Sequence, residues 1–233
     1  MSTREAMRAY KGQHLVEFPN DYVIIDIETT GFNPKFCEII EIGAVRVCDD
    51  KITSIFQSMV RPKNPINSYI TNLTGITNNM IADANPIEAV LDSFLSFIGD
   101  TVLVGHNVNS DINFLYDYCE MYLSSHLSND FIDIRELFRE QQSSALNHKL
   151  ATMCEKCAIQ NTNTHRALTD CLAAYNLYHS LKMHDGPIAC VEELDTLNLA
   201  SEFKIKHSPY KRKCHRKEAG VDKSFRVSRA LYP

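Results

Sequence analysis

Three apolar segments near the N-terminus predict that this chain forms an antiparallel sheet. The first, DYVIIDIETTG from Asp21, has four consecutive β-forming residues and then alternates up to a glycine turn. The second and third, residues 39–47 and 52–60, are joined by the short polar segment from Cys48 to Lys51, which is typical of a β-hairpin. We therefore predict that the first three strands form an antiparallel meander.

The rest of the chain alternates short apolar runs with helical periodicity. Residues 61–77 read as a loop, and a helix is predicted over 86–100, opening at Pro86. The run at 101–105 predicts a strand buried on both faces, and a second short apolar run follows at 131–134. Further helices are predicted from Asp111 onward and at about 134–141, 148–158 and 166–183. This order indicates an α/β fold, with a mixed sheet flanked by helices.

Composition sets the expected domain limits and compartment. With 233 residues and 44% hydrophobic content, the chain suits one domain at 20–184, with an N-terminal extension at 1–19 and a C-terminal extension at 185–233. The eight cysteines are scattered, so we expect reduced thiols. No apolar run approaches a membrane span, so we expect a cytoplasmic protein without membrane contact.

The C-terminal extension carries a basic tail from Lys204 to Arg229, with aromatic residues among its cations. Such a tail suits binding to single strands, docking to a partner, or a solvated extension.

Two carboxylates stand at the end of the first apolar segment. Asp26 and Glu28 are two residues apart, so the alternation of a strand puts both on the same face. Two acids at such a position repel each other and lose solvation, and divalent cations such as Mg²⁺ or Mn²⁺ are the simplest compensation. The alternative is that one of these acids caps a turn.

Two further acids stand near predicted helix starts. Asp111 follows the polar segment GHNVNS, where an Asp also has a plain structural use as an N-cap. Asp170 lies in the first turns of the last predicted helix, and His165 precedes it by five residues. An imidazole with an ordinary pKa of about 6.5 can accept a proton from water near neutral pH. Taken singly, a histidine at such a position is more often a surface or capping residue.

Together the three motifs, D-x-E-T-T-G, H-N-x-x-x-D and H-x-A-x-x-D, resemble in order and content those of the DEDDh exonucleases, the family of the proofreading subunit of bacterial DNA polymerase III. The resemblance runs from about Asp21 to Lys182 and includes the phrases LTGIT (73–77) and HKLATMCEKC (148–157). It implies a ribonuclease-H-like fold and a metal-dependent 3′→5′ exonuclease that releases nucleoside 5′-monophosphates. One departure is Ser110, where relatives often have an aromatic or apolar residue.

The resemblance also implies roles for single residues. Two divalent ions, Mg²⁺ or Mn²⁺, would stabilise the attacking and leaving oxygens, and His165 would be the general base. The T-T-G segment of the family lies near the terminal sugar, which implies that Thr29 and Thr30 recognise the 3′-hydroxyl. Asn107 is a further substrate contact or orders its own loop. The implied metal ligands are Asp26, Glu28, Asp111 and Asp170.

Substrate and partners stay open between alternatives. We expect single-stranded DNA 3′ ends, with trimming of RNA 3′ ends as the alternative and a DNA polymerase subunit as a further partner. A non-catalytic binding module on the same fold would be favoured by a missing acid, and none is missing. Asp133 is an acid after apolar residues to which the family pattern assigns no role. Cys154 and Cys157 have half of a zinc-site spacing, and core packing is preferred for them.

Overall fold

The three apolar segments near the N-terminus form the predicted meander. In the computed structural model, which describes residues 8–141, 147–159 and 165–183, β1 (Tyr22–Thr29), β2 (Ile39–Cys48) and β3 (Lys51–Met59) pair in antiparallel order. Asp49 and Asp50, which connect β2 and β3, both have a positive φ, at 49° and 60°. A two-residue hairpin turn of this kind matches the twist of its strands, so the predicted hairpin is confirmed.

Two short strands extend the sheet in parallel. β4 (Leu103–Gly105) pairs with β1, and β5 (Phe131–Asp133) pairs with β4, so the strand order is β3-β2-β1-β4-β5. Both strands are buried throughout, as the continuous apolar runs predicted. The mixed sheet and its helices confirm the predicted α/β class.

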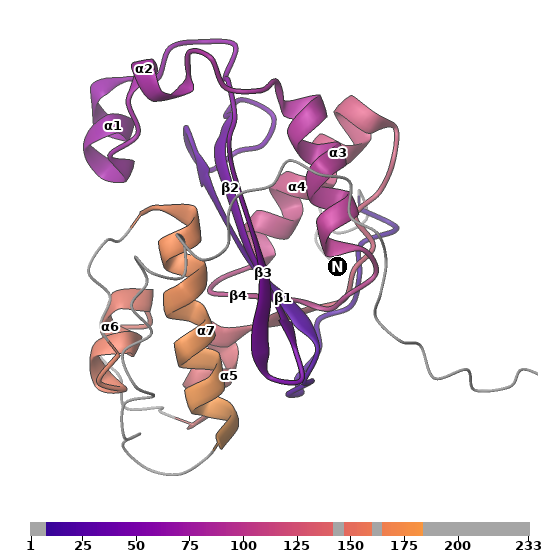
Figure 1. The fold of residues 1–233 in the computed structure, drawn as a ribbon, viewed down its shortest axis with the longest axis vertical. Coiled ribbons are helices and arrows are strands. Elements are labelled where there is room, and N and C mark those ends of the chain that lie inside the picture. The colour runs from indigo at the N-terminus through magenta and orange to yellow at the C-terminus, as the bar shows by residue number, and fades with distance from the viewer. Residues whose placement is uncertain (1–7, 142–146, 160–164, 184–233) are drawn as a thin grey trace, which may run out of the picture.

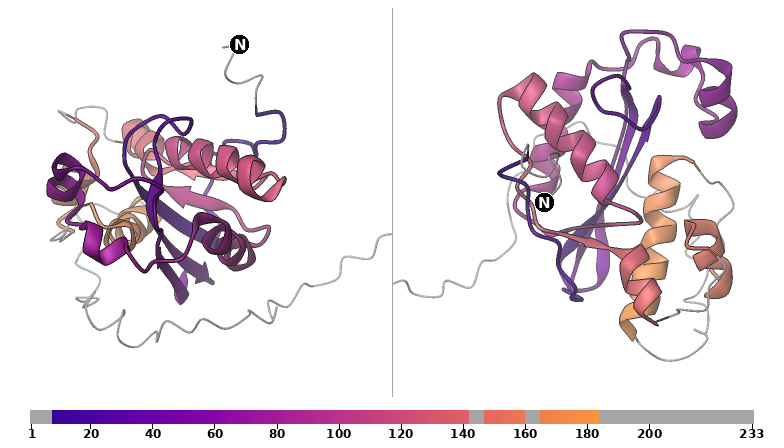
Figure 2. Two further views of the ribbon diagram at one scale, coloured as in Figure 1. Left: turned by 90° about the horizontal axis from the view of Figure 1, so that it is seen from above. Right: turned by 180° about the vertical axis from the view of Figure 1, so that it is seen from behind.

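Helices cover both faces of the sheet, as Figures 1 and 2 show. One face packs against α3 and α4, and the other against α5, α6 and α7. None of the helices in the described ranges is both long and apolar enough to cross a membrane. The helices are α1 (Ser68–Thr74), α2 (Asn78–Ile81), α3 (Ile87–Ile98), α4 (Asn109–Leu123), α5 (Ile134–Gln141), α6 (Leu150–Lys156) and α7 (Ala167–Met183).

The segment 61–77 was predicted to be a loop, and this prediction is wrong because the segment contains α1. Asn67 caps the helix through its side chain, which accepts a hydrogen bond from the backbone N–H of Ile70, and Gly75 ends it in a left-handed conformation. Apart from Leu73 its residues are weak helix formers, so local propensity does not mark the helix. Tertiary packing stabilises it instead, in a cluster formed by Ile40, Ile66, Ile70, Ile76 and Ile81.

The two faces of β1 have different partners. Val23, Ile25 and Ile27 pack on the side of α3 and α4, whereas Tyr22 and Ile24 pack on the side of α7. Because side chains alternate along a strand, Asp26 and Glu28 continue the face that α7 covers. The acids therefore stand where the apolar part of that face ends.

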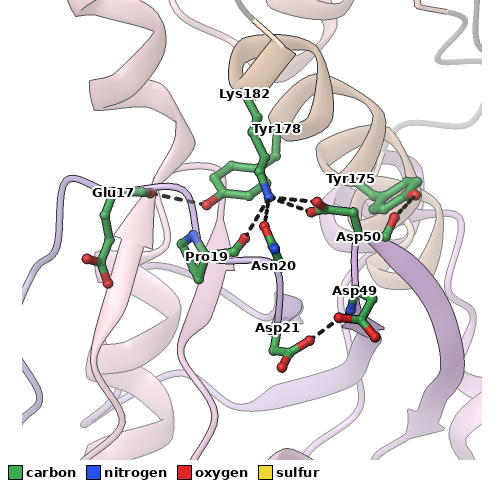
Figure 3. Close-up of polar contacts among 9 residues, drawn as sticks. All are labelled: Glu17, Pro19, Asn20, Asp21, Asp49, Asp50, Tyr175, Tyr178 and Lys182. Carbon is green, nitrogen blue, oxygen red and sulfur yellow. Dashed lines mark hydrogen bonds and ion pairs between the residues drawn. The ribbon is translucent and has the colours of Figure 1, made fainter.

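The C-terminal end of α7 is fixed by a polar network centred on Lys182, drawn in Figure 3. The Lys182 ammonium group donates to both carboxylate oxygens of Asp50, at 2.6 and 2.8 Å, and to Pro19 O and the Asn20 side chain. We call these four residues the Lys182 network. It ties the last turn of α7 to the β2–β3 turn and to the segment that enters β1.

Part of the predicted N-terminal extension contacts the helices and the sheet edge. His14 forms a parallel bridge with Phe131 of β5, and Arg8 makes a two-bond ion pair with Asp117 of α4, at 2.8 and 2.7 Å. Residues 185–233, assigned to a C-terminal extension, lie outside the described residues.

Candidate active site

Two acids of the site come from β1. Asp26 is half-buried, and Glu28 is 9% exposed, on the face that α7 covers. In the sheet Asp26 lies opposite Gly43 and Glu28 lies opposite Glu41. The predicted placement of both carboxylates on one face agrees with this register.

The other two acids come from helices on opposite sides of the sheet. Asp111 lies in the first turn of α4, which begins at Asn109 after Val108, so Asp111 does not cap the helix. Asp170 lies in the first turn of α7 and is 9% exposed. The N-terminal ends of the two helices thus bring acids to β1 from both faces of the sheet.

The acids of β1, α4 and α7 are close enough to influence the pKa of Asp26. Burial raises the pKa of Asp26 well above its ordinary value, and the charges of Asp111, Glu28 and Asp170 raise it further. Burial likewise raises the pKa of Asp111, with a further contribution from the charge of Glu28. The pKa of Glu28 rises to about 8, mainly through burial and then through the charge of Asp170. Burial also raises the pKa of Asp170, and acids in such an environment are stable as anions only beside positive charge.

His165 lies beside two of the acids. It is exposed, and ligand atoms of His165, Glu28 and Asp170 all lie within 4.8 Å of one another. Its φ of 65° is left-handed, a region that is uncommon for residues other than glycine. Its backbone N–H donates to Asp170 Oδ2 at 2.9 Å, which holds the histidine next to the carboxylate.

The donor set fits divalent cations. Asp170 Oδ1 is buried and has no hydrogen-bond partner within the described residues, although its other oxygen is held by His165 N–H. A buried carboxylate oxygen without a partner is costly unless a ligand satisfies it. Clustered carboxylates are the ligands that hard ions such as Mg²⁺ and Mn²⁺ prefer.

The hydroxyl groups of Thr29 and Thr30, which were expected near the substrate, also form hydrogen bonds within the loop that follows β1. Thr29 Oγ1 donates to Gly31 O at 2.7 Å, and Thr30 Oγ1 accepts from the backbone N–H of Glu38 at 2.8 Å. The hydrogen of the Thr30 hydroxyl group is not used in that bond, so it can donate to a ligand. Thr29 is the last residue of β1 and directly follows Glu28, and Thr30 is the first residue of the loop.

Asn107 orders its loop. Its φ is 56°, its backbone N–H donates to Asp133 Oδ1 at 2.9 Å, and its side-chain oxygen accepts from Arg135 at 3.1 Å. Asp133, to which the family pattern assigns no role, is 5% exposed, and its charge raises the pKa of Asp111. Asp133 therefore supports the loop that leads into Asp111.

A cavity of about 990 Å³ opens between α4 and the loop that follows β1, and none of the four acids is among its lining residues. Ser110 and Phe114 line it from α4. Phe32 and Phe36 line it from the loop and are 98% and 83% exposed. Exposed aromatic side chains on the loop that follows the acids of β1 suit stacking on a base.

Sequence reasoning missed three residues that shape the site. Glu41 is fully buried in β2, Arg166 forms an ion pair with it at 3.0 Å, and Gly43 contacts the first turn of α7. A charged residue inside the apolar run IIEIGAVRV was a usable signal for Glu41. Nothing local marked Gly43, because its constraint comes from a helix far along the chain.

The two cysteines with half of a zinc-site spacing are free thiols. Cys154 is buried in α6, and burial raises its pKa to about 12. Cys157 follows the end of the same helix and packs against the core on the α7 side. The preferred interpretation, core packing, agrees with this placement.

Comparison with known proteins gives one family and a consistent set of relatives. The family model described as Exonuclease (RNase_T) matches residues 23–178. The chain is 36% identical over 200 residues to a PolC-type DNA polymerase III of Caldanaerobacter subterraneus subsp. tengcongensis, covering 85% of this chain and 14% of that protein. It is 38% identical over 192 residues to that of Bacillus subtilis, covering 82% of this chain and 13% of that protein. The chain thus spans about one seventh of these relatives.

Solved structures share the fold. Exonuclease X in complex with 5′ overhanging duplex DNA aligns with a TM-score of 0.56 and 27% identity, covering 70% of this chain and 92% of that one. The zinc-bound complex of E. coli exonuclease I with single-stranded DNA aligns with a TM-score of 0.61 and 18% identity, covering 70% and 40%.

Proposed function

The chain belongs to the RNase_T exonuclease family and is a 3′→5′ exonuclease, and we propose that it removes nucleotides from the 3′ ends of single-stranded DNA with Mg²⁺ or Mn²⁺. The observation that carries this proposal is the convergence of four acids and one histidine on the end of β1. The residues proposed to ligate two ions are Asp26, Glu28, Asp111 and Asp170.

Bound divalent ions would supply Lewis-acid stabilisation of charge on the phosphate and on the attacking and leaving oxygens. His165 is proposed to accept a proton from the attacking water, since it is exposed and lies beside Glu28 and Asp170. The water oxygen then bonds to the terminal phosphorus, and the bond from phosphorus to the 3′-oxygen of the next nucleotide breaks. That oxygen takes a proton from solvent, and a nucleoside 5′-monophosphate leaves.

Recognition of the strand end is assigned to the loop after β1. Thr30 has a hydroxyl hydrogen free to donate to a 3′-oxygen, and Thr29 stands beside Glu28. Asn107 is proposed as a further substrate contact, although its side chain already accepts from Arg135. The exposed Phe32 supports a single-stranded substrate, because an unpaired base can stack on it.

Single-stranded DNA is favoured over RNA by the neighbours, because the exonuclease I complex contains single-stranded DNA. Proofreading beside a polymerase is the proposed context, since the relatives that match most of this chain are polymerases. RNA 3′-end trimming is the second candidate, because the proposed ions contact phosphate, which both polymers share.

The test is digestion of a 5′-labelled single strand by the purified chain. We expect a descending ladder that requires Mg²⁺ or Mn²⁺ and disappears in Asp26→Ala, with DNA cut faster than a matched RNA. Faster cutting of RNA would reverse the substrate assignment. A protein that binds the strand but never shortens it, with any divalent ion, would instead be a non-catalytic binding module.

A further inference from the structure

Glu41 is a buried acid that the proposed chemistry does not use. Its side chain is fully buried in β2, where an isolated carboxylate would be strongly destabilising. Four hydrogen-bond donors surround the Glu41 carboxylate and offset the cost of burying its charge. Gln57 Nε2 and Arg166 Nη2 donate to Oε1 at 2.8 and 3.0 Å, and Arg166 Nε and the backbone N–H of Ala167 donate to Oε2 at 3.0 and 3.2 Å. We call this the Glu41 network.

The network fixes the first turn of α7. Arg166 and Ala167 stand directly after His165, and Asp170 lies one turn later in the same helix. Ala167 N–H is one of the donors that a helix start leaves without an intrahelical partner, so Glu41 satisfies it from the neighbouring strand. Two residues along β2, Gly43 has no side chain, which lets the backbone of Ala167 and Leu168 approach the sheet.

The same network reaches the proposed metal ligands on β1. Glu41 is the cross-strand partner of Glu28, and Arg166 holds the pKa of Glu28 lower than burial alone would set it. Arg166 therefore stands between a buried acid and a site acid, close to both. A two-bond guanidinium–carboxylate pair fixes orientation as well as charge.

We propose that Glu41 is a positioning residue of the active site: through Arg166 and the Ala167 N–H it sets where His165 and Asp170 lie relative to Asp26 and Glu28. This inference rests on the exonuclease function proposed above. A group that orients metal ligands typically changes activity or metal affinity by about 10–100-fold when it is replaced.

The decisive comparison sets Glu41→Gln against Lys182→Met. The first variant keeps the shape of Glu41 but turns one acceptor into a donor that faces Arg166 or Ala167 N–H. The second breaks the Lys182 network, which fixes the other end of the same helix (Figure 3). Both variants should lower the melting temperature of the full chain, and only the first should disturb the site.

The measurements are the melting temperature, kcat and KM on a 5′-labelled single strand with saturating Mg²⁺, and Mn²⁺ affinity by electron paramagnetic resonance. For Glu41→Gln we expect kcat to fall by about 10–100-fold and Mn²⁺ to bind about tenfold more weakly, with little change in KM. For Lys182→Met we expect wild-type kcat and Mn²⁺ affinity. If the two variants lose kcat in step with their melting temperatures, or if Glu41→Gln keeps both kcat and Mn²⁺ affinity, the positioning role is refuted.

If Glu41→Gln does not fold, Arg166→Lys takes its place as the test variant. It keeps the positive charge but cannot form the two-bond pair, so a loss of kcat supports positioning and full activity refutes it. An inactive wild-type chain would refute the proposed function but not the positioning role, because the Mn²⁺ affinities of Glu41→Gln and Lys182→Met could still be compared.

Discussion

Gly43→Ala tests how finely the start of α7 is placed against the sheet. Gly43 lies opposite Asp26 in the β1–β2 pairing and faces the first turn of α7. A Cβ atom added there would lie 2.6 Å from both Ala167 C and Leu168 N, and these are backbone atoms that cannot rotate away. The substitution adds one methyl group and changes no charge, so its effect must come through displacement.

The expected size follows from that distance. Ordinary contact begins at 3.4 Å, so the helix start and the strand must separate by about 0.8 Å. A displacement of about 1 Å at a catalytic group can lower the rate by roughly 10²-fold. Because Asp170 and His165 move with this turn, we expect kcat to fall about 10–100-fold. Overpacking should also lower the free energy of unfolding by about 1–3 kcal/mol.

The assay is steady-state digestion of a 5′-labelled strand, together with urea unfolding of the same preparation. Gly99→Ala is the matched control, since Gly99 has a φ of 53° and a ψ of −138° but open space around its added Cβ. Backbone strain there should lower stability by about 1–3 kcal/mol without moving α7. A Gly43→Ala enzyme with wild-type kcat, or two variants with the same kcat, would show that the close approach does not place the site.

Four further outcomes are expected. Without divalent ions the protein should become less stable as the pH rises from about 4.5 to about 8. Over this interval folded Glu28, with its raised pKa, keeps a proton that the unfolded chain has released. A melting temperature in EDTA that rises over this interval contradicts the reasoning. Mg²⁺ should restore more stability at the upper end of that interval than at the lower, since protonated acids bind it poorly. Phe32→Ala should raise KM for single strands about 5–150-fold with kcat unchanged, since stacking contributes roughly 1–3 kcal/mol per base. An unchanged KM would remove Phe32 from the binding surface. Lys182→Met should lower the free energy of unfolding by about 1.5–3 kcal/mol in urea denaturation, because Asp50 loses its charged donor. A change within about 0.5 kcal/mol, as at ordinary surface sites, would mean that the network adds no stability.

The regular elements were predictable where their pattern is local. Alternation and apolar runs marked all five strands, and the two-residue spacing of Asp26 and Glu28 was enough to put both acids on one face of a strand. The helix α1 escaped prediction because most of its residues are weak helix formers and its stability comes from packing against Ile40. The sequence motifs named the site residues through a family resemblance, and nothing in their spacing required them to meet.

By itself the sequence determined which segments become strands and helices and which residue types are available for chemistry, because backbone geometry imposes those periods on every chain. Only the tertiary structure decided that Glu41 meets Arg166, which is 125 positions away, and that Gly43 lies under the first turn of α7. Such contacts depend on how a helix packs across a sheet, and the packing is set by the whole core. Local sequence motifs therefore identify the acids, whereas the distances between the acids are set by the fold.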